Sequence, residues 1–122
     1  MARVTIPVQV IPGINEPAAD ALFANLTTAI SATDGAQVDM SGSDDRILIL
    51  IQNAATSAKT VTIKAGNGVA GVVDLEKSIA ASSYTLLRVD SARFKNLSGA
   101  DKGNLLITGD SADIKVAVFR LP

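Results

Sequence analysis

The sequence predicts a single small, mostly β domain, either a β-sandwich or a jelly-roll-like barrel, with an extended N-terminal arm. The chain has 122 residues, which is the usual size of one domain. Hydrophobic residues make up 48% of it and aromatic residues only 3%, a mixture more typical of a packed sheet protein than of a disordered tail. Short β-branched runs separated by Gly, Asp and Ser turns recur along the chain, which favours Greek-key connections.

The first residues predict an extended arm over residues 1–14, ahead of a sandwich over residues 15–122. The run from Arg3 to Ile11 is rich in β-branched residues, but Pro7 and Pro12 each remove a ladder donor. Prolines confine such a run to a sheet edge or an extended segment. We interpret it as an arm that reaches a neighbouring subunit, so that its removal leaves a folded domain with weaker binding. The candidate subunit contacts on this arm are Arg3, Val4, Ile6, Val8 and Val10.

The next stretch predicts a short helix and then the main core strand. Residues 15–30 carry a mixed signal, and we predict a helix over Glu16–Asn25. The run Arg46–Gln52 is apolar on both faces, which predicts a strand covered on both sides, in a sandwich centre or at a subunit interface. Lys59–Lys64 alternates, with Val61 and Ile63 facing inward. We interpret these two runs as consecutive antiparallel strands.

The second half predicts further strands and a closing hairpin. The pattern of residues 72–83 is ambiguous, whereas Tyr84–Val89 is typical of a strand, and Ser91–Asn96 predicts another short one. Asn104–Thr108 and Asp113–Arg120 are joined by a Gly-Asp turn, which we interpret as a hairpin that ends the domain.

The residue types present argue against several classes of function. Eleven Lys and Arg against 12 Asp and Glu create no strong field for nucleic acid or an acidic membrane. The chain has no cysteine and no histidine, which removes thiol nucleophiles, thiolate metal sites and the usual acid–base group near neutral pH. We therefore predict a protein that is not an enzyme, with no catalytic residues and no cofactor. The N-terminal segment lacks the apolar run of a signal peptide or membrane span, so we expect a soluble product made in a cytoplasm.

One glycine-rich segment offers a rival hypothesis. Gly66-Asn67-Gly68-Val69-Ala70-Gly71 is a literal G-x-G-x-x-G motif, and Asp90 lies at the distance of a ribose-binding acid, which would suit a nucleotide-dependent enzyme. The preceding strand alternates, however, whereas a central parallel strand is buried on both faces. The residues after Asp90 also predict strands, which leaves no room for further βα units. We favour a hairpin loop in which Asn67-Gly68 supplies positive φ.

Four acidic residues could gather around a hard cation such as calcium, but their spacing matches no calcium loop. We interpret them as turn and rim residues and predict no metal site. They are Asp34, Asp39, Asp44 and Asp45.

Phe94 lies between two cations. We favour a core position for Phe94 with its neighbours pointing outward, as a period of two requires. The alternative is a contact patch for an acidic protein surface, so Arg93 and Lys95 are kept as candidate subunit contacts.

The order of short segments along the chain resembles that of the small decoration, or cement, proteins of tailed-bacteriophage heads, from about Thr33 onward. The segments are Thr33-Asp34-Gly35-Ala36, the strand Ile47–Asn53, Val61-Thr62-Ile63, Gly66-Asn67-Gly68, Asp90–Asn96, Ser98-Gly99, Lys102-Gly103 and Ile114–Leu121. The resemblance implies a β-sandwich that coats the outside of an assembled capsid and binds across neighbouring copies of the major capsid protein, often as a homotrimer. It brings no catalytic residues.

The sequence therefore leads to the hypothesis of a structural virion protein that stabilises a bacteriophage capsid through protein–protein contacts. Self-association is expected, with a trimer as one form. An alternative within the binding proteins is a tail, fibre or surface module that recognises a receptor or a glycan. The rival from another class is the nucleotide-dependent enzyme.

Overall fold

The computed structural model describes residues 3–12, 15–17, 28–40, 46–68, 71, 73–89, 91–100 and 102–121. Apart from one short helix, the regular elements of this part of the chain are strands, so the mostly β prediction is confirmed. In chain order they are β1 (Val4–Thr5), β2 (Val8–Val10), β3 (Thr28–Ala29), β4 (Ala36–Asp39), β5 (Ile47–Asn53), β6 (Lys59–Ile63), β7 (Leu75–Ile79), β8 (Ser83–Leu87), α1 (Ser91–Phe94), β9 (Asn104–Gly109) and β10 (Ile114–Arg120).

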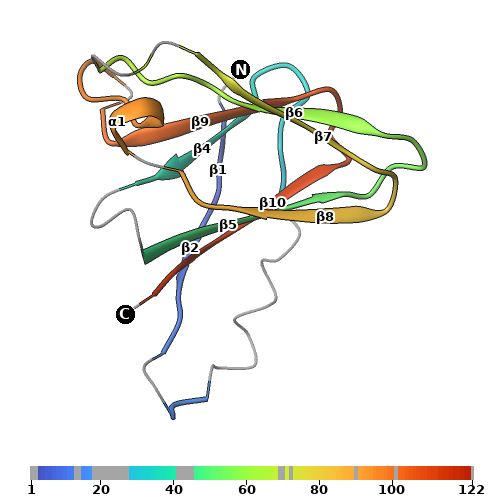
Figure 1. Ribbon diagram of the computed structural model, residues 1–122, viewed down its shortest axis with the longest axis horizontal. Helices are drawn as coiled ribbons and strands as arrows, with labels where there is room; N and C mark the ends of the chain where they lie inside the picture. Colours follow the sequence, from blue (N-terminus) through green and yellow to red (C-terminus); the bar gives the residue numbers. More distant parts are fainter. Residues whose placement is uncertain are drawn as a thin grey trace.

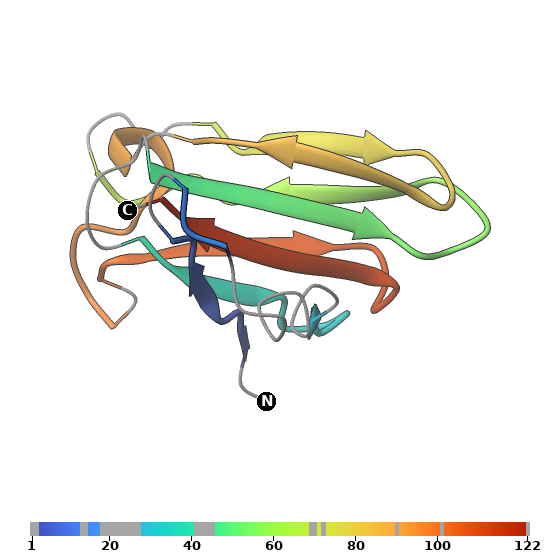
Figure 2. The ribbon, with the colours of Figure 1, turned by 90° about the horizontal axis from the view of Figure 1, so that it is seen from below.

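The strands form two sheets that pack face to face as a β-sandwich. One sheet has the order β1-β4-β9-β6-β7, and the other has the order β2-β10-β5-β8, with β3 paired to β10. Figure 1 shows the first sheet above the second, and Figure 2 shows the strands of the molecule from below. Most neighbouring strands are antiparallel, but β1 pairs in parallel with β4, and β2 in parallel with β10.

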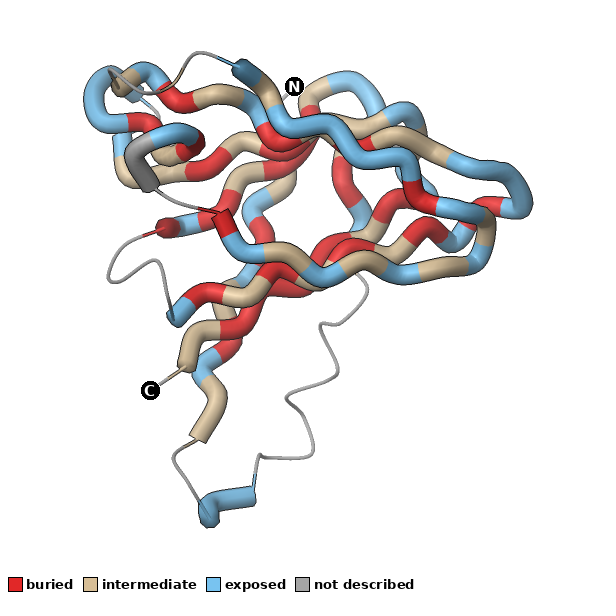
Figure 3. Tube along the Cα trace, viewed as in Figure 1, coloured by how far each residue is buried: buried red, intermediate tan, exposed pale blue. Residues whose placement is uncertain are grey.

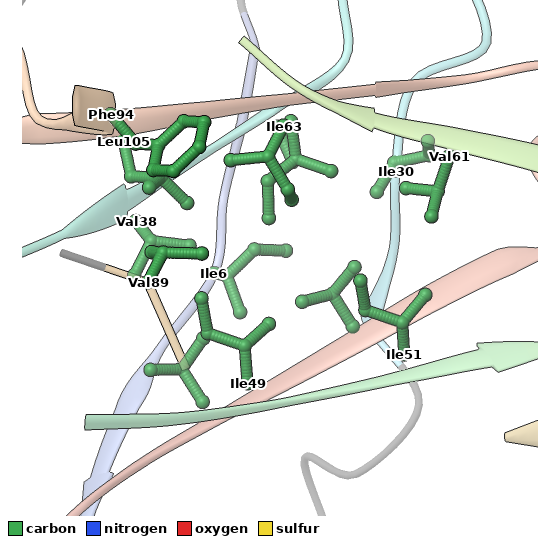
Figure 4. Close-up of a cluster of buried hydrophobic side chains, with 14 of the residues drawn as sticks. Ile6, Ile30, Val38, Ile49, Ile51, Val61, Ile63, Val89, Phe94 and Leu105 are labelled. Atoms are coloured by element: carbon green, nitrogen blue, oxygen red, sulfur yellow. The ribbon is translucent and has the colours of Figure 1, made fainter. Parts of the chain in front are cut away.

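The core lies between the two layers and is filled by aliphatic side chains. Alternate residues of β5 point inward, and Ile49 and Ile51 have no exposed surface. Val61 and Ile63 are each 1% exposed, as their alternation predicts. Buried positions (red) recur along the strands of both layers in Figure 3, and Figure 4 shows the side chains meeting between them. Burying one such side chain contributes about 1.5–3 kcal/mol, so this cluster stabilises the fold.

Two predicted pairings between consecutive strands are wrong. β5 and β6 lie in different sheets, and so do β9 and β10, so the expected closing hairpin is a corner between the layers. The alternation of apolar residues shows which side chains face the core, but it does not show which strand lies alongside. A short polar turn serves equally for a hairpin and for a crossing between sheets. The hairpin that does form joins β6 to β7, which lies within the ambiguous residues 72–83.

Two local predictions also need comment. Ser91–Phe94 is a helical turn instead of a strand, and only Lys95 makes a β-bridge, to Leu105. The chain must cross here from β8 in one sheet to β9 in the other, and the turn places Phe94, 7% exposed, over the core. Of the helix predicted over Glu16–Asn25, only Glu16 and Pro17 are described, and they are not helical; the rest lies outside the described residues.

The outer face of β5 is half-exposed rather than covered. Leu48, Leu50 and Gln52 have intermediate exposure, while the opposite face of the strand is buried. The prediction of a strand covered on both sides thus holds for its inner face.

Within the described part of the chain, no helix has the length and apolar character needed to cross a membrane.

Candidate interaction surface

The N-terminal segment lies along one open side of the sandwich and belongs to both sheets. The Val4 N–H donates to Gly35 O at 3.2 Å, and the Ile6 N–H donates to Gln37 O at 3.0 Å. After Pro7 the chain enters the second sheet, where Val8 pairs with Val118. The blue strand in Figure 1 passes from one layer to the other in this way. The segment is extended and at a sheet edge, as the prolines predict, and its partners are strands of its own domain.

The candidate contacts on this segment have different exposures. Ile6 is 1% exposed and lies in the core, so its prediction as a subunit contact is corrected: the residue closes the space between the sheets. Val4 and Val8 are partly buried and pack against the same core. Arg3 is exposed, and Val10 is 62% exposed. Of the five candidate contacts on this segment, only Arg3 and Val10 are therefore exposed, whereas Ile6, Val4 and Val8 contact the core.

A second surface is formed where the β6–β7 loop meets the segment around α1, at the left of Figure 1. We call it the loop end and define it as the described residues 64–68, 71, 73, 74, 93–100, 102 and 103. It contains both candidate cations, Arg93 and Lys95, which therefore lie near the glycine-rich motif. Arg93 is exposed and Lys95 is half-buried. The two sets of residues are about thirty positions apart in the sequence, and the fold brings them together.

Asn67 joins the two halves of the loop end. Its Oδ1 accepts a hydrogen bond from the Leu97 N–H at 2.6 Å, and its Nδ2 donates to Ser98 O at 2.9 Å. Asparagine often bonds backbone groups in turns, but the sequence did not show that the partner lies in another loop. Neither Asn67 nor Gly68 has positive φ, so that part of the hairpin prediction is wrong. The side chain acts as a clamp between loops.

Asn96 holds the second half of the loop end in the same manner. This residue is 8% exposed, and its Nδ2 donates to Asn104 O at 3.1 Å. Its carbonyl oxygen accepts from the Gly103 N–H at 2.7 Å. Gly103 has φ of 86°, a conformation that favours glycine. The turn between Asn96 and Asn104 is thus closed by its own hydrogen bonds.

The first glycine of the motif allows two backbones to pack closely. The Gly66 N–H donates to Arg93 O at 2.8 Å, and a Cβ at Gly66 would collide with Lys95 O. The loop joins the antiparallel strands β6 and β7, whereas a dinucleotide fingerprint opens a helix between parallel strands. The need for glycine at position 66 is therefore explained by its close packing against the chain's own backbone.

Gly66→Ala is expected to lower the free energy of unfolding by about 1–3 kcal/mol, because the methyl group would force apart the loop and the segment after α1. Thermal or urea unfolding measures the loss. Gly99→Ala is a poor control because its φ of 83° adds strain of its own, so Ala65→Gly, next in the same loop, is the better comparison. Equal stability of Gly66→Ala and wild type would contradict the close packing.

One ion pair borders the loop end. Lys64 Nζ lies 2.9 Å from Asp74 Oδ2, and the Ala65 N–H donates to Asp74 Oδ1 at 2.7 Å. The hydrogen bond from Ala65, followed by the one from Lys64, lowers the pKa of Asp74 below its usual value. The carboxylate therefore stays charged at neutral pH and closes the base of the β6–β7 hairpin.

The exposed side chains of the loop end combine apolar and cationic character. Val73 is 73% exposed and Leu97 is 49% exposed. Among the cations of the loop end, Arg93 and Lys102 are exposed and Lys95 is half-buried. Sequence reasoning selected the two cations but missed Val73 and Leu97, since a lone apolar residue in a loop carries no periodic signal. The loop end thus exposes both apolar and cationic side chains, a combination suited to contact with another protein.

Two of the four acidic residues considered for a cation, Asp34 and Asp39, lie within the described part of the chain. Asp34 belongs to the tight turn between Ser31 and Gly35, where its N–H donates to Ser31 Oγ at 3.1 Å. Asp39 is exposed on β4, and residues 44 and 45 lie outside the described residues. Among the residues that the structure describes, no three acidic side chains are grouped as a metal site.

Comparison of the chain with protein-family models, with curated proteins and with solved structures gives no match.

Proposed function

We propose that this chain is a structural virion protein that decorates the outer surface of a bacteriophage capsid and stabilises it by binding across major capsid subunits. One observation carries the proposal. Four of the segments on which the sequence resemblance rests come together at the loop end. They are Gly66-Asn67-Gly68, Arg93–Asn96, Ser98-Gly99 and Lys102-Gly103. Three of them follow one another over residues 93–103, and the hydrogen bonds of Gly66 and Asn67 bring the fourth against that stretch, so all four can serve as parts of a single contact surface.

The construction of the loop end suits that role. Its loops are tied by the side chains of Asn67 and Asn96, so little conformational entropy is lost when a partner binds. Val73 and Leu97 supply exposed apolar area, and Lys95, close to Leu97 in the chain, supplies a cation for acidic side chains at the rim of the partner's surface. A capsid repeats the same binding site many times, so a modest affinity at each site is enough to coat the shell. The formal net charge of −1 allows many copies to lie close together.

The decisive experiment locates the chain in purified particles. We expect it on the outer surface, at positions that bridge neighbouring major capsid subunits. Particles that lack the chain should assemble and remain infectious but lose resistance to heat or to a chelator. A location in the tail or fibre, or unchanged particle stability without the chain, would contradict the proposal. Self-association of the purified chain, including the trimer that the resemblance implies, is measured separately by its mass in solution.

Substitutions at the loop end are expected to reduce occupancy on such particles. Leu97→Asp and Lys95→Glu each place negative charge on the proposed contact surface, and we expect each to weaken binding at least about tenfold. Leu75→Asp and Lys77→Glu on β7 are matched controls, since Leu75 is 42% exposed and Lys77 is also exposed. Occupancy is measured from the ratio of this chain to major capsid protein in washed particles. Equal losses in the variants and in the controls would place the contact elsewhere.

A further inference from the structure

Among the strands that the structure describes, β8 is the last of its sheet, and one side of its backbone has no ladder partner there. In β5 the residues that bond to β10 are the even-numbered ones, because the Ala54 N–H donates to Asp113 O and the Leu121 N–H donates to Arg46 O. Hydrogen-bonded and non-hydrogen-bonded pairs alternate along an antiparallel ladder, so odd-numbered β5 residues bond to β8, as in the pair of Ile51 with Thr85. The N–H and C=O groups of the even-numbered residues of β8 therefore point away from the sheet.

These even-numbered residues, Tyr84 and Leu86, also have exposed apolar side chains. Tyr84 is 57% exposed and Leu86 is 61% exposed, on the outer face beside the half-exposed Leu50. An edge strand of this kind is usually protected by a charge or a proline. The edge strand β7 of the other sheet carries Glu76 on its free side, by the same alternation. β8 consists of Ser, Tyr, Thr, Leu and Leu and has neither protection.

We propose that β8 pairs with β8 of a second copy of this chain, antiparallel, around a two-fold axis at Thr85. In this register Tyr84 lies opposite Leu86 of the partner subunit, and Leu86 lies opposite Tyr84 of the partner subunit. Each of these pairs exchanges backbone hydrogen bonds and also places an aromatic side chain against an aliphatic one. The contact joins the β8 sheet of one copy to the β8 sheet of the other, so that their outer apolar faces form one continuous surface.

A second copy is the occupant that fits this edge, because the edge is complementary to itself. The two residues with outward backbone groups are the two with exposed apolar side chains, and the two-fold register pairs one with the other. No charge from β8 is brought opposite a like charge. A contact of this type closes at two copies, so it joins chains or larger assemblies in pairs. It does not depend on the proposed capsid role, since it concerns a different side of the molecule.

The first test is the mass of the chain in solution by light scattering or sedimentation, with Leu86→Pro as the variant. Proline removes the outward N–H of Leu86, which makes no bond to β5, so the fold is retained while the edge is blocked. We expect the wild-type assembly to be halved in mass by Leu86→Pro. Ser78→Pro on the free side of β7 is the matched control and should leave the mass unchanged. A wild-type monomer up to a concentration of about 1 mM would overturn the proposal.

The second test is a cross-link at the axis. The chain contains no cysteine, and Thr85→Cys would place a single thiol beside its copy, in a non-hydrogen-bonded pair about 4.5 Å apart at Cα, within the range of a disulfide. We expect efficient oxidation to a covalent dimer, whereas Ser78→Cys should remain largely monomeric on a non-reducing gel. This result decides the matter if circular dichroism shows that Leu86→Pro unfolds. Absence of the Thr85→Cys cross-link, or pairing of β8 only with a strand of another protein, would overturn the proposal.

Discussion

Replacement of Asn53 by alanine is expected to lower the free energy of unfolding by about 3–5 kcal/mol. Asn53 is completely buried at the end of β5. Its Nδ2 donates to Ile79 O at 2.9 Å and to Ser57 O at 3.0 Å, and its Oδ1 accepts from the Ala55 N–H at 2.9 Å. One side chain thus provides hydrogen-bond partners for backbone groups in the turn after β5 and at the end of β7, and β7 belongs to the other sheet. Alanine would leave the Ile79 carbonyl oxygen and the Ala55 N–H buried without this partner, at about 1–3 kcal/mol each before relaxation.

The measurement is urea unfolding followed by circular dichroism. Gln52→Ala is the matched control, since Gln52 is the preceding residue of the same strand but is only half-buried on the outer face. We expect that control to cost less than about 1 kcal/mol. Asn53→Asp retains the acceptor for Ala55 but loses the donor to Ile79 O, so it should be nearly as unstable as Asn53→Ala. A loss below about 1 kcal/mol for Asn53→Ala would show that water or a shifted turn replaces the side chain.

The period of two in the sequence predicted much of this fold because it depends on burial alone. The inward positions of β6 and of β10 follow from the alternation of Val61 with Ile63 and of Ile114 with Val116. The same signal could not give the pairing of the strands. The inward side chains of a strand are buried to the same extent whether the next strand lies alongside it or in the opposite layer. The sequence therefore predicts hairpins after β5 and β9, where the structure has corners between the sheets.

The loop end could be predicted only in part, for a similar reason. Arg93 and Lys95 stand out in the sequence because they flank an aromatic residue. The clamp at Asn67 does not, since its partners Leu97 and Ser98 lie about thirty residues away and are fixed by the packing of the two sheets. A residue whose role is a contact between loops leaves no local pattern, whereas a residue that faces the core does.

The largest difference from the sequence prediction concerns the N-terminal segment, and Ile6 tests it. Ile6→Ala is expected to lower the free energy of unfolding by about 2–5 kcal/mol, because the side chain is 1% exposed and its loss leaves a cavity between the sheets. Val10→Ala is the matched control on the same segment. Val10 is 62% exposed, so the change should stay within about 0.5 kcal/mol. Urea unfolding of the full chain provides both values.

Deletion of residues 1–12 extends this argument to the segment as a whole. The sequence led us to expect a folded domain with weaker binding after this deletion. The structure leads to a different expectation, because the deletion removes Ile6 from the core and exposes the edges of β4 and β10, which pair with β1 and β2. The truncated chain should unfold at a much lower urea concentration or aggregate. If it instead unfolds like the wild type, and Ile6→Ala behaves like Val10→Ala, then the segment is separable and free to bind a neighbouring subunit.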